Sequence, residues 1–356
     1  MTIHDIKAKK FNIPLADSFS YHTLTLTKLE YVLVEILSLK KQSGIGEAAL
    51  AWDVTGETQD GSIAVVALIC DIVRNSRVET VKDIEKIMGH IDNNLFGNTA
   101  TKCAIESALF DLLGKQRKKP IYKLLNGKDK QWISFHKTFS FEESQNDLNK
   151  QMAFLVAQGV KLFKFKVGAN EDKEAHMILS VRKNFPFVDI VLDANQTWDD
   201  YRDALFFLRQ IRKARILWIE QPLKVHDYMG MQLMRRKINV KIMADESCHN
   251  LFDLEVLKKY NAVDLINIKL AKCGGLLAAR KMIVFCEKHK IKYMLGDMIH
   301  SSVGTAYNLH AATLGNFITH DLTSPQRLKK DKAHGLVFNG FDVCIPEEHG
   351  LGVSLT

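Results

Sequence analysis

Three short apolar runs, each closed by a carboxylate, decide the fold: DIVLDAN (189–195), RILWIEQP (215–222) and VKIMADES (240–247). The carboxylates are Asp193, Glu220 and Asp245, which lie 27 and 25 residues apart. A strand, a helix and two loops fill such an interval. The repeat therefore predicts successive β/α units that each deliver one carboxylate from a strand end.

The same alternation extends on both sides of this stretch. Five further strand candidates are WISFHKTFS (132–140), LFKFKVG (162–168), DLINIKL (264–270), IKYMLGD (291–297) and FITHDL (317–322). Helical stretches separate the eight candidates, which predicts an α/β fold built on a parallel (β/α)8 barrel of the TIM type, with its active site at the carboxyl ends of the strands. An open doubly wound sheet is the alternative, but no glycine-rich dinucleotide fingerprint follows the first strand of the series.

The first 125 residues have a different order of predicted strands and helices. Strand-like stretches at 6–13 and 29–38 precede a helix at 99–116, whose apolar residues recur with the spacing of a buried stripe. We therefore predict an N-terminal α+β domain over 1–125 and the barrel over 126–321. The segment 322–356 has no barrel unit of its own, so we expect it to pack back on the N-terminal domain.

Composition excludes several classes of function. The chain has 356 residues, is 46% hydrophobic and carries a formal charge of +8, which predicts a globular protein. Its basic residues are scattered and accompany no recognition motif, so we expect no nucleic acid partner. No apolar run reaches the length of a membrane span, and the amino terminus lacks the apolar core of a secretion signal. The six cysteines lie far apart. We expect a cytoplasmic protein that does not contact membranes and forms a homo-oligomer.

Lysines flank the three carboxylates on both sides. Lys164 and Lys166 share one face of the strand before them, because side chains alternate along a strand, and Lys269 ends the strand after them. In a closed barrel of eight strands, Lys166 and Lys269 lie four strands apart and face each other across the mouth. Three converging carboxylates are typical ligands for a hard divalent cation.

This arrangement suits removal of a proton from the carbon next to a carboxylate. The enediolate that forms carries extra negative charge, which a divalent cation stabilises. One lysine takes the proton, and the opposite lysine returns a proton from the other side or holds the anion while a leaving group departs. The predicted partner is therefore a small molecule that bears a carboxylate.

Five motifs together resemble the enolase superfamily, in particular its muconate lactonizing enzyme subgroup and the dipeptide epimerases within it. The motifs are the Lys-x-Lys strand at 164–166, DANQ from Asp193, IEQP from Ile219, ADES from Ala244 and INIKLAKCGG from Ile266. The resemblance covers essentially the whole chain. It implies a modified barrel closed by the N-terminal domain as a capping domain.

The resemblance also implies roles for individual residues. It implies one Mg²⁺ per subunit held by Asp193, Glu220 and Asp245, and an acid/base pair formed by Lys166 and Lys269. Auxiliary residues are Lys164, Asn195 and Glu246. Capping loops at 18–27 and 48–58 supply specificity, and the second contains VTGET with Thr55. Substrate-binding candidates are Thr55, Thr138, Asp297, His300, Asp321 and Thr323.

Two positions depart from the family pattern. Dipeptide epimerases carry Asp-x-Asp after the eighth strand, where the carboxylates bind the ammonium group of the substrate, whereas this chain reads Asp321, Leu322, Thr323. Relatives usually place a glutamate after the seventh strand, where this chain has GDMIHS with Asp297 and His300. Both differences indicate that this chain acts on a different substrate from its relatives or binds the amino group of the substrate in a different way.

The leading hypothesis is a Mg²⁺-dependent epimerase that acts next to a carboxylate of a dipeptide. Three alternatives keep the same chemistry: a cycloisomerase, an o-succinylbenzoate synthase and an N-acylamino acid racemase. A fourth is a noncatalytic carboxylate-binding protein, although binding alone does not require two opposed amines.

Overall fold

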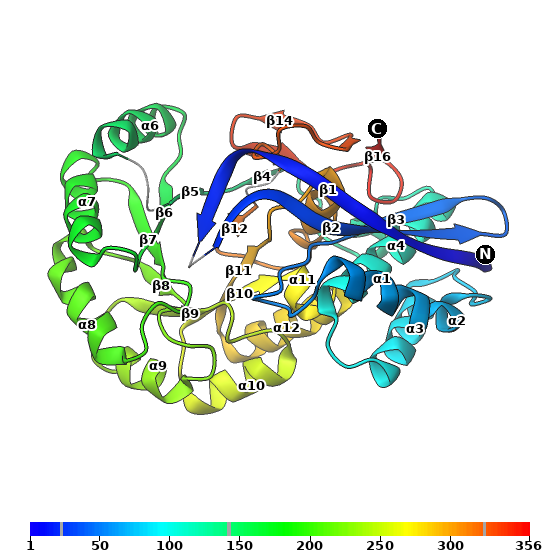
Figure 1. Ribbon diagram of the computed structural model, residues 1–356, viewed down its shortest axis with the longest axis horizontal. Helices are drawn as coiled ribbons and strands as arrows, with labels where there is room; N and C mark the ends of the chain where they lie inside the picture. The colour runs from blue at the N-terminus through cyan, green and yellow to red at the C-terminus, as the bar shows by residue number, and fades with distance from the viewer. Residues whose placement is uncertain (22–23, 141–143, 323–324) are drawn as a thin grey trace.

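An antiparallel sheet opens the chain. The computed structural model describes residues 1–21, 24–140, 144–322 and 325–356. Strands β1 (Ile3–Tyr21), β2 (Leu24–Ser38) and β3 (Ser43–Ala48) form a meander. The helices that follow are α1 (Gln59–Leu68), α2 (Cys70–Val73), α3 (Val81–Asn94), α4 (Thr99–Arg117) and α5 (Ile121–Leu124). Figure 1 shows the end of β1 and the start of β2 reaching over the barrel strands.

Helix α4 is the core of this capping domain. Every residue from Ala100 to Gly114 is buried, because one side of the helix packs on β3 and the other on the barrel helix α11 (Leu270–Cys273). Two strand glycines allow the close approach to β3. A Cβ at Gly46 would lie 1.9 Å from the carbonyl oxygen of Ala104, and one at Gly44 would lie 2.0 Å from that of Ala108.

Replacing Gly46 by alanine should therefore destabilise the protein. The new methyl group forces β3 and α4 apart, and such overpacking typically costs about 1–3 kcal/mol. Gly89 in α3 is the control, because a Cβ there meets nothing within 4 Å and alanine is the better helix former by up to about 1 kcal/mol. Urea denaturation should show Gly46→Ala less stable and Gly89→Ala at least as stable as the wild type. Equal stabilities for the two variants would contradict this packing.

Eight parallel strands form the barrel. In sheet order they are β5 (Lys137–Phe139), β6 (Leu162–Lys166), β7 (Asp189–Asp193), β8 (Trp218–Glu220), β9 (Lys241–Ala244), β10 (Leu265–Lys269), β11 (Lys292–Gly296) and β12 (His320–Asp321). The edge strands β5 and β12 are joined by a hydrogen bond of 3.3 Å from His136 N to His320 O. The predicted TIM-type barrel with an N-terminal α+β domain is confirmed.

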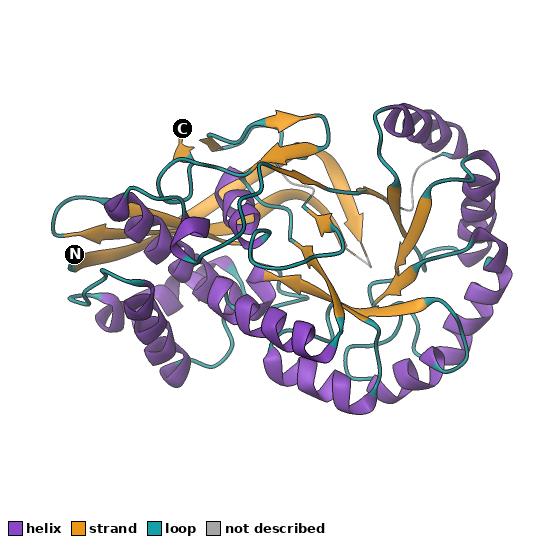
Figure 2. Cartoon of the chain, turned by 180° about the vertical axis from the view of Figure 1, so that it is seen from behind, coloured by secondary structure: helices purple, strands orange, loops and turns teal. Residues whose placement is uncertain are grey.

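Helices cover the outside of the strands (Figure 2). They are α6 (Gln145–Ala157), α7 (Glu171–Asn184), α8 (Tyr201–Gln210), the 3₁₀ turn η1 (Arg212–Ala214), α9 (Tyr228–Arg235), α10 (Leu251–Tyr260), α11, α12 (Leu276–His289) and α13 (Ser302–Ala311). Side-chain caps begin most of them; Asn250 and Asp253, for example, form a capping box at the start of α10. No helix of the described segments is long and apolar enough to cross a membrane.

The first predicted barrel strand is two strands in the structure. Residues Trp132–Ser134 form β4, which pairs antiparallel with β15 (Asp342–Cys344), and only Lys137–Phe139 joins the barrel. The continuous prediction over 132–140 was wrong on this point. Between the two strands, His136 N donates to β12 instead of continuing the ladder of β4.

The C-terminal segment lies against the capping domain. Its strands are β13 (Ala333–His334), β14 (Phe338–Asn339), β15 and β16 (Ser354–Leu355). Ala16 N donates to Arg327 O at 2.8 Å, and Lys329 N donates to Pro14 O at 3.0 Å. Farther on, Gly350 forms a bridge with Pro120.

A buried glutamate connects the capping domain to the barrel. Glu106 of α4 accepts hydrogen bonds from Tyr307 Oη at 2.6 Å and from Leu277 N at 3.3 Å, at the amino end of α12. Burial raises the pKa of Glu106 to about 7, although the Tyr307 hydrogen bond opposes the rise.

This carboxyl should make stability pH-dependent. Because its pKa is higher in the folded chain than in the unfolded chain, its contribution is full below about pH 4.5 and is lost as pH rises through 7. Glu106→Gln removes this dependence, so the stability of the variant relative to wild type should increase by up to about 3 kcal/mol between pH 4.5 and pH 8. Urea denaturation across this range measures the effect. If the stabilities of the two proteins changed with pH in parallel, Glu106 would have the same pKa in the folded and unfolded chain, which would contradict the prediction.

Candidate active site

Strand register brings the predicted residues to one rim of the barrel. Lys166 of β6 pairs with Asp193 of β7, which pairs with Glu220 of β8. Farther round the sheet, Lys269 ends β10 and Asp321 ends β12 at the same level. Because parallel strands point the same way, all five side chains start from the carboxyl end of the barrel.

One ammonium group lies among three of the carboxylates. Lys164 Nζ is 2.6 Å from Asp321 Oδ2, 2.8 Å from Glu220 Oε2 and 3.2 Å from Asp193 Oδ2. Lys166 Nζ lies 2.8 Å from the same oxygen of Asp193. Both lysines are buried, so carboxylates rather than solvent surround their amino groups.

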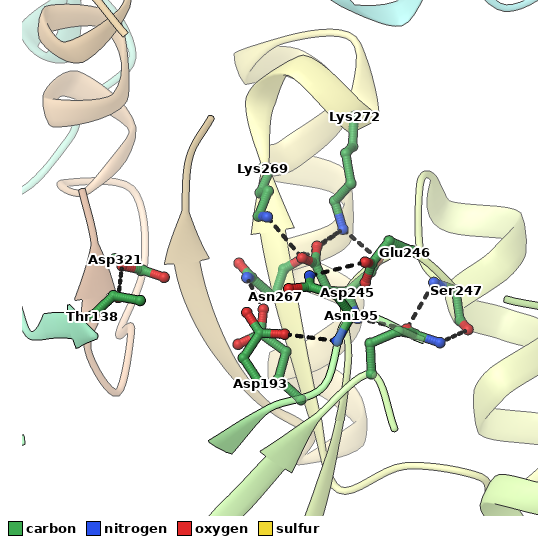
Figure 3. Close-up of polar contacts among 12 residues, drawn as sticks. Thr138, Asp193, Asn195, Asp245, Glu246, Ser247, Asn267, Lys269, Lys272 and Asp321 are labelled. Atoms are coloured by element: carbon green, nitrogen blue, oxygen red, sulfur yellow. Dashed lines mark hydrogen bonds and ion pairs between the residues drawn. The ribbon is translucent and has the colours of Figure 1, made fainter. Parts of the chain in front are cut away.

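Two further lysines hold Asp245 (Figure 3). Lys269 Nζ is 2.7 Å from Asp245 Oδ2, and Lys272 Nζ is 2.5 Å from Asp245 Oδ1. Lys272 also donates to the carbonyl oxygen of Asp245 and, at 3.2 Å, to that of Asn267. The amide of Asn267 donates to Glu220 Oε1 at 2.7 Å. These ion pairs and hydrogen bonds connect the carboxyl ends of β8, β9 and β10.

The amide of Asn195 links Lys166 to a fifth carboxylate, that of Glu246. Asn195 Oδ1 accepts a hydrogen bond from Lys166 Nζ, and Asn195 Nδ2 donates to Glu246 Oε1 at 3.2 Å. Within the described chain, the other oxygen of Glu246 is buried without a hydrogen-bond partner. The three predicted auxiliary residues, Lys164, Asn195 and Glu246, therefore surround the carboxylates.

The donor set fits a hard cation, although the side chains are arranged around ammonium groups. Among the residues that the structure describes, no three carboxylate, imidazole or thiol groups lie close enough to chelate a metal as they stand. The reason is visible in the contacts, since Lys164 lies between Glu220 and Asp193. Glu220 Oε2 is buried, and Lys164 Nζ lies 2.8 Å from it. Carboxylate oxygens are the ligands that Mg²⁺ prefers.

The pKa values of these carboxyl groups are shifted in different directions. Burial, followed by the charge of Asp193, raises the pKa of Glu220 above its usual value. Burial acts in the same direction on Asp245, but Lys269 and Lys272 outweigh it and lower the pKa of that carboxyl. Of the three predicted metal ligands, Glu220 is the one whose pKa is raised, since the pKa of Asp193 is also lowered.

A cavity of about 600 Å³ opens above these residues. Its barrel wall contains Thr138, Lys164, Lys166, Asp193, Asn195, Asp245, Glu246, Lys269, Asp297 and Asp321. The capping domain contributes residues from both predicted specificity loops, among them Phe19, Leu24, Leu26, Leu50, Trp52 and Asp53. Substrate in this cavity would touch the lysines on one side and the capping loops on the other.

Some of the predicted substrate-binding residues line the cavity, and others do not. Thr138, Asp297 and Asp321 line the cavity. Asp321 is already engaged, because Oδ2 binds Lys164 and Oδ1 lies 3.3 Å from His136 Nε2 and 3.4 Å from Thr138 Oγ1. Thr323 lies outside the described residues.

Two other candidates are not among the described residues that line the cavity. They are His300 and Thr55, and their contact with substrate stays a prediction. The hydroxyl of Thr55 donates to Ala51 O at 3.2 Å, as expected for a turn. His300 is buried and turns its Nδ1 to Glu47 of the capping domain, at 2.8 Å.

Sequence reasoning missed three polar residues of the site. Lys272 lies in α11, three residues after Lys269 at the end of β10, and this short distance along the chain could have indicated it. Gln221 Oε1 accepts from the backbone N–H groups of Asp245 and Ser247, which orients the loop after β9. His136 carried no local signal, because its partner Asp321 is 185 residues away.

Comparison with known proteins identifies the family. Residues 147–356 match the family model described as enolase C-terminal domain-like, and residues 18–126 match the mandelate racemase/muconate lactonizing enzyme N-terminal domain. The chain belongs to the enolase superfamily. The dipeptide epimerase resemblance is also confirmed, since many relatives within the superfamily bear that description.

Individual relatives of this superfamily member span its whole length. The L-Ala-D/L-Glu epimerase of Clostridium acetobutylicum is 30% identical over 99% of both chains. The structure of an N-succinyl Arg/Lys racemase from Bacillus cereus matches with a TM-score of 0.94 at 27% identity, over 100% of this chain and 96% of that one. A dipeptide epimerase from Enterococcus faecalis, complexed with Mg and the dipeptide L-Leu-L-Tyr, matches with a TM-score of 0.92 at 29% identity, over 99% and 100% of the two chains. The chain is therefore an enzyme of the isomerase class, in a group of epimerases and racemases.

Proposed function

We propose that this enolase superfamily member is a Mg²⁺-dependent epimerase that inverts the carbon next to a carboxylate of a dipeptide. One observation carries the proposal: Lys166 and Lys269 approach the row of carboxylates from opposite sides. Lys166, on β6, contacts Asp193, and Lys269, four strands away on β10, contacts Asp245. Relatives described as dipeptide epimerases support the reaction class.

Asp193, Glu220 and Asp245 would hold the Mg²⁺ ion. When bound, the cation supplies positive charge that stabilises the negative charge gathering on the substrate carboxylate as its α-proton leaves. Glu220 fits this role because it is a buried carboxylate that lies beside Asp193 at the carboxyl end of the barrel.

The lysines move the protons. Neutral Lys166 Nζ takes the α-proton, so that the C–H bond breaks and an N–H bond forms. The ammonium of Lys269 then donates a proton to the opposite face of the same carbon, which completes inversion. Asn195 orients Lys166 through the hydrogen bond to its amine. Because amine protons exchange with water, the inverted product carries a solvent hydrogen.

A second candidate function is racemisation of an N-acylated amino acid. The observation that favours it is the engagement of Asp321, whose two oxygens contact His136, Thr138 and Lys164. A carboxylate so engaged is a poor partner for a substrate ammonium, and an N-acyl group needs none. The structural match to the N-succinyl Arg/Lys racemase is consistent with this alternative.

Deuterium exchange tests both candidates. The purified protein is incubated with Mg²⁺ in D₂O and with libraries of dipeptides and N-acyl amino acids, and products are analysed by mass spectrometry and chiral chromatography. We expect a one-unit mass gain at the inverted carbon, and the class that exchanges faster identifies the substrate type. Absence of exchange across both libraries would refute an epimerase or racemase of either class.

A further inference from the structure

A buried glutamate of the capping domain holds the loop between β11 and α13. Glu47 lies in β3 and is 4% exposed. Its Oε1 lies 2.8 Å from His300 Nδ1, and both of its oxygens lie 3.3 Å from Ser301 N. The hydroxyl of Ser301 also donates to Oε2. Since a carboxylate only accepts hydrogen bonds, Nδ1 of His300 carries the proton in this pair.

Two further features hold the same loop. Tyr31 of β2 donates its hydroxyl to Ile299 O at 2.8 Å. Gly304 of α13 leaves the space that the pair occupies, because a Cβ there would lie 2.2 Å from His300 Nδ1 and 2.9 Å from Glu47 Oε1. The capping domain therefore contacts the loop through two strands.

The loop forms part of the cavity wall. Asp297, Met298 and Ile299 line the cavity, and His300 follows them directly but is buried behind them. Fixing His300 and Ser301 to Glu47 therefore fixes the wall that substrate touches. Hydrogen bonds to a charged group are stronger than neutral ones, and a buried one is costly to break.

Glu47 favours a hydrogen-bond donor at position 300. A glutamate at position 300 would place two carboxylates together in a buried space, which is unfavourable. The imidazole instead donates to Glu47. Burial lowers the pKa of His300, but the hydrogen bond and charge of Glu47, together with the charge of Asp297, outweigh it and the pKa is raised.

We infer that His300 is a positioning residue that, through Glu47, fixes the wall formed by residues 297–299 and so determines how tightly substrate binds. It acts through the wall and does not contact the reacting atoms. The inference rests on the proposed function for its kinetic consequence, while its structural consequence can be measured without substrate.

Three variants of His300 test the inference. His300→Asn keeps a donor near the position of Nδ1, His300→Leu removes the donor, and His300→Glu adds a second carboxylate. For the leucine variant we expect KM to rise about tenfold, the equivalent of one buried charged hydrogen bond, while kcat stays within about twofold because binding is lost equally in the ground and transition states. The asparagine variant should retain the wild-type KM, and the glutamate variant should resemble or exceed the leucine variant.

Hydrogen exchange measured by mass spectrometry separates this inference from the proposed function. Without any substrate, peptides that cover 292–304 and 43–48 should lose protection in His300→Leu and keep it in His300→Asn. Unchanged protection in His300→Leu would overturn the inference, whatever the substrate proves to be. A fall in kcat with unchanged KM in both the leucine and asparagine variants would also overturn it, because that result identifies direct participation in the reaction. If the wild-type protein inverts no substrate but the protection pattern is as expected, the proposed function fails and the positioning role of His300 stands.

Discussion

Replacing Lys166 by methionine is expected to slow inversion about 10²–10⁴-fold, the contribution of a positioned acid or base. Methionine has a similar length and no proton to transfer. Lys269 still reaches the opposite face of the substrate, so exchange of the α-proton should continue for the epimer whose hydrogen faces Lys269. Lys269→Met should show the mirror result, with exchange only in the other epimer. Each variant is assayed with both epimers in D₂O, with NMR following the loss of the α-proton signal.

The matched control is Lys224→Met. Lys224 lies in the loop after β8, is about half exposed, and bonds Gln196 O at 2.7 Å outside the carboxylate set. Its loss should leave inversion and exchange near the wild-type rates. Loss of exchange in both epimers with either methionine variant would contradict the assignment of one lysine to each face.

Glu220→Gln is expected to abolish Mg²⁺ dependence and to lower activity about 10³-fold or more, since a bound cation contributes several kcal/mol of transition-state stabilisation. The amide removes one negative charge from a fully buried position and presents N–H groups where a cation needs oxygen. Isothermal titration with Mg²⁺ should show at least about a hundredfold weaker binding. Dialysis of the wild type against a chelator should give the same loss of activity, with recovery when Mg²⁺ is added.

Glu106→Gln is the matched control for this experiment, because Glu106 is also buried but contacts Tyr307 and Leu277 instead of the site. Its Mg²⁺ affinity should equal that of the wild type. If Glu220→Gln bound Mg²⁺ as tightly as the wild type, Glu220 would not be a ligand.

The barrel could be predicted from sequence because its signal is local and repeated. Each strand is an apolar run of a few residues, and Asp193, Glu220 and Asp245 occupy equivalent places at or just beyond the ends of three of them. Side-chain alternation then put Lys164 and Lys166 on one face, and register brought Lys166 beside Asp193. These relations follow from the geometry of parallel strands.

Contacts between distant segments could not be predicted in this way. Glu47 and His300 are 253 residues apart and meet only because β3 of the capping domain lies against α13. His300 was a candidate for substrate contact because it follows a barrel strand, whereas its Nδ1 lies 2.8 Å from Glu47. The split of 132–140 into two strands has the same origin, since the partner of β4 is β15 near the end of the chain.

The opposed placement of the two lysines is best tested by a crystal structure with Mg²⁺ and a substrate in the cavity. The measurement is the distance from the reacting carbon to Lys166 Nζ and to Lys269 Nζ. We expect both amines to lie within about 3–3.5 Å of that carbon, on opposite faces, with the ion bound by Asp193, Glu220 and Asp245. Both amines on one face, or either amine turned out of the cavity, would contradict it.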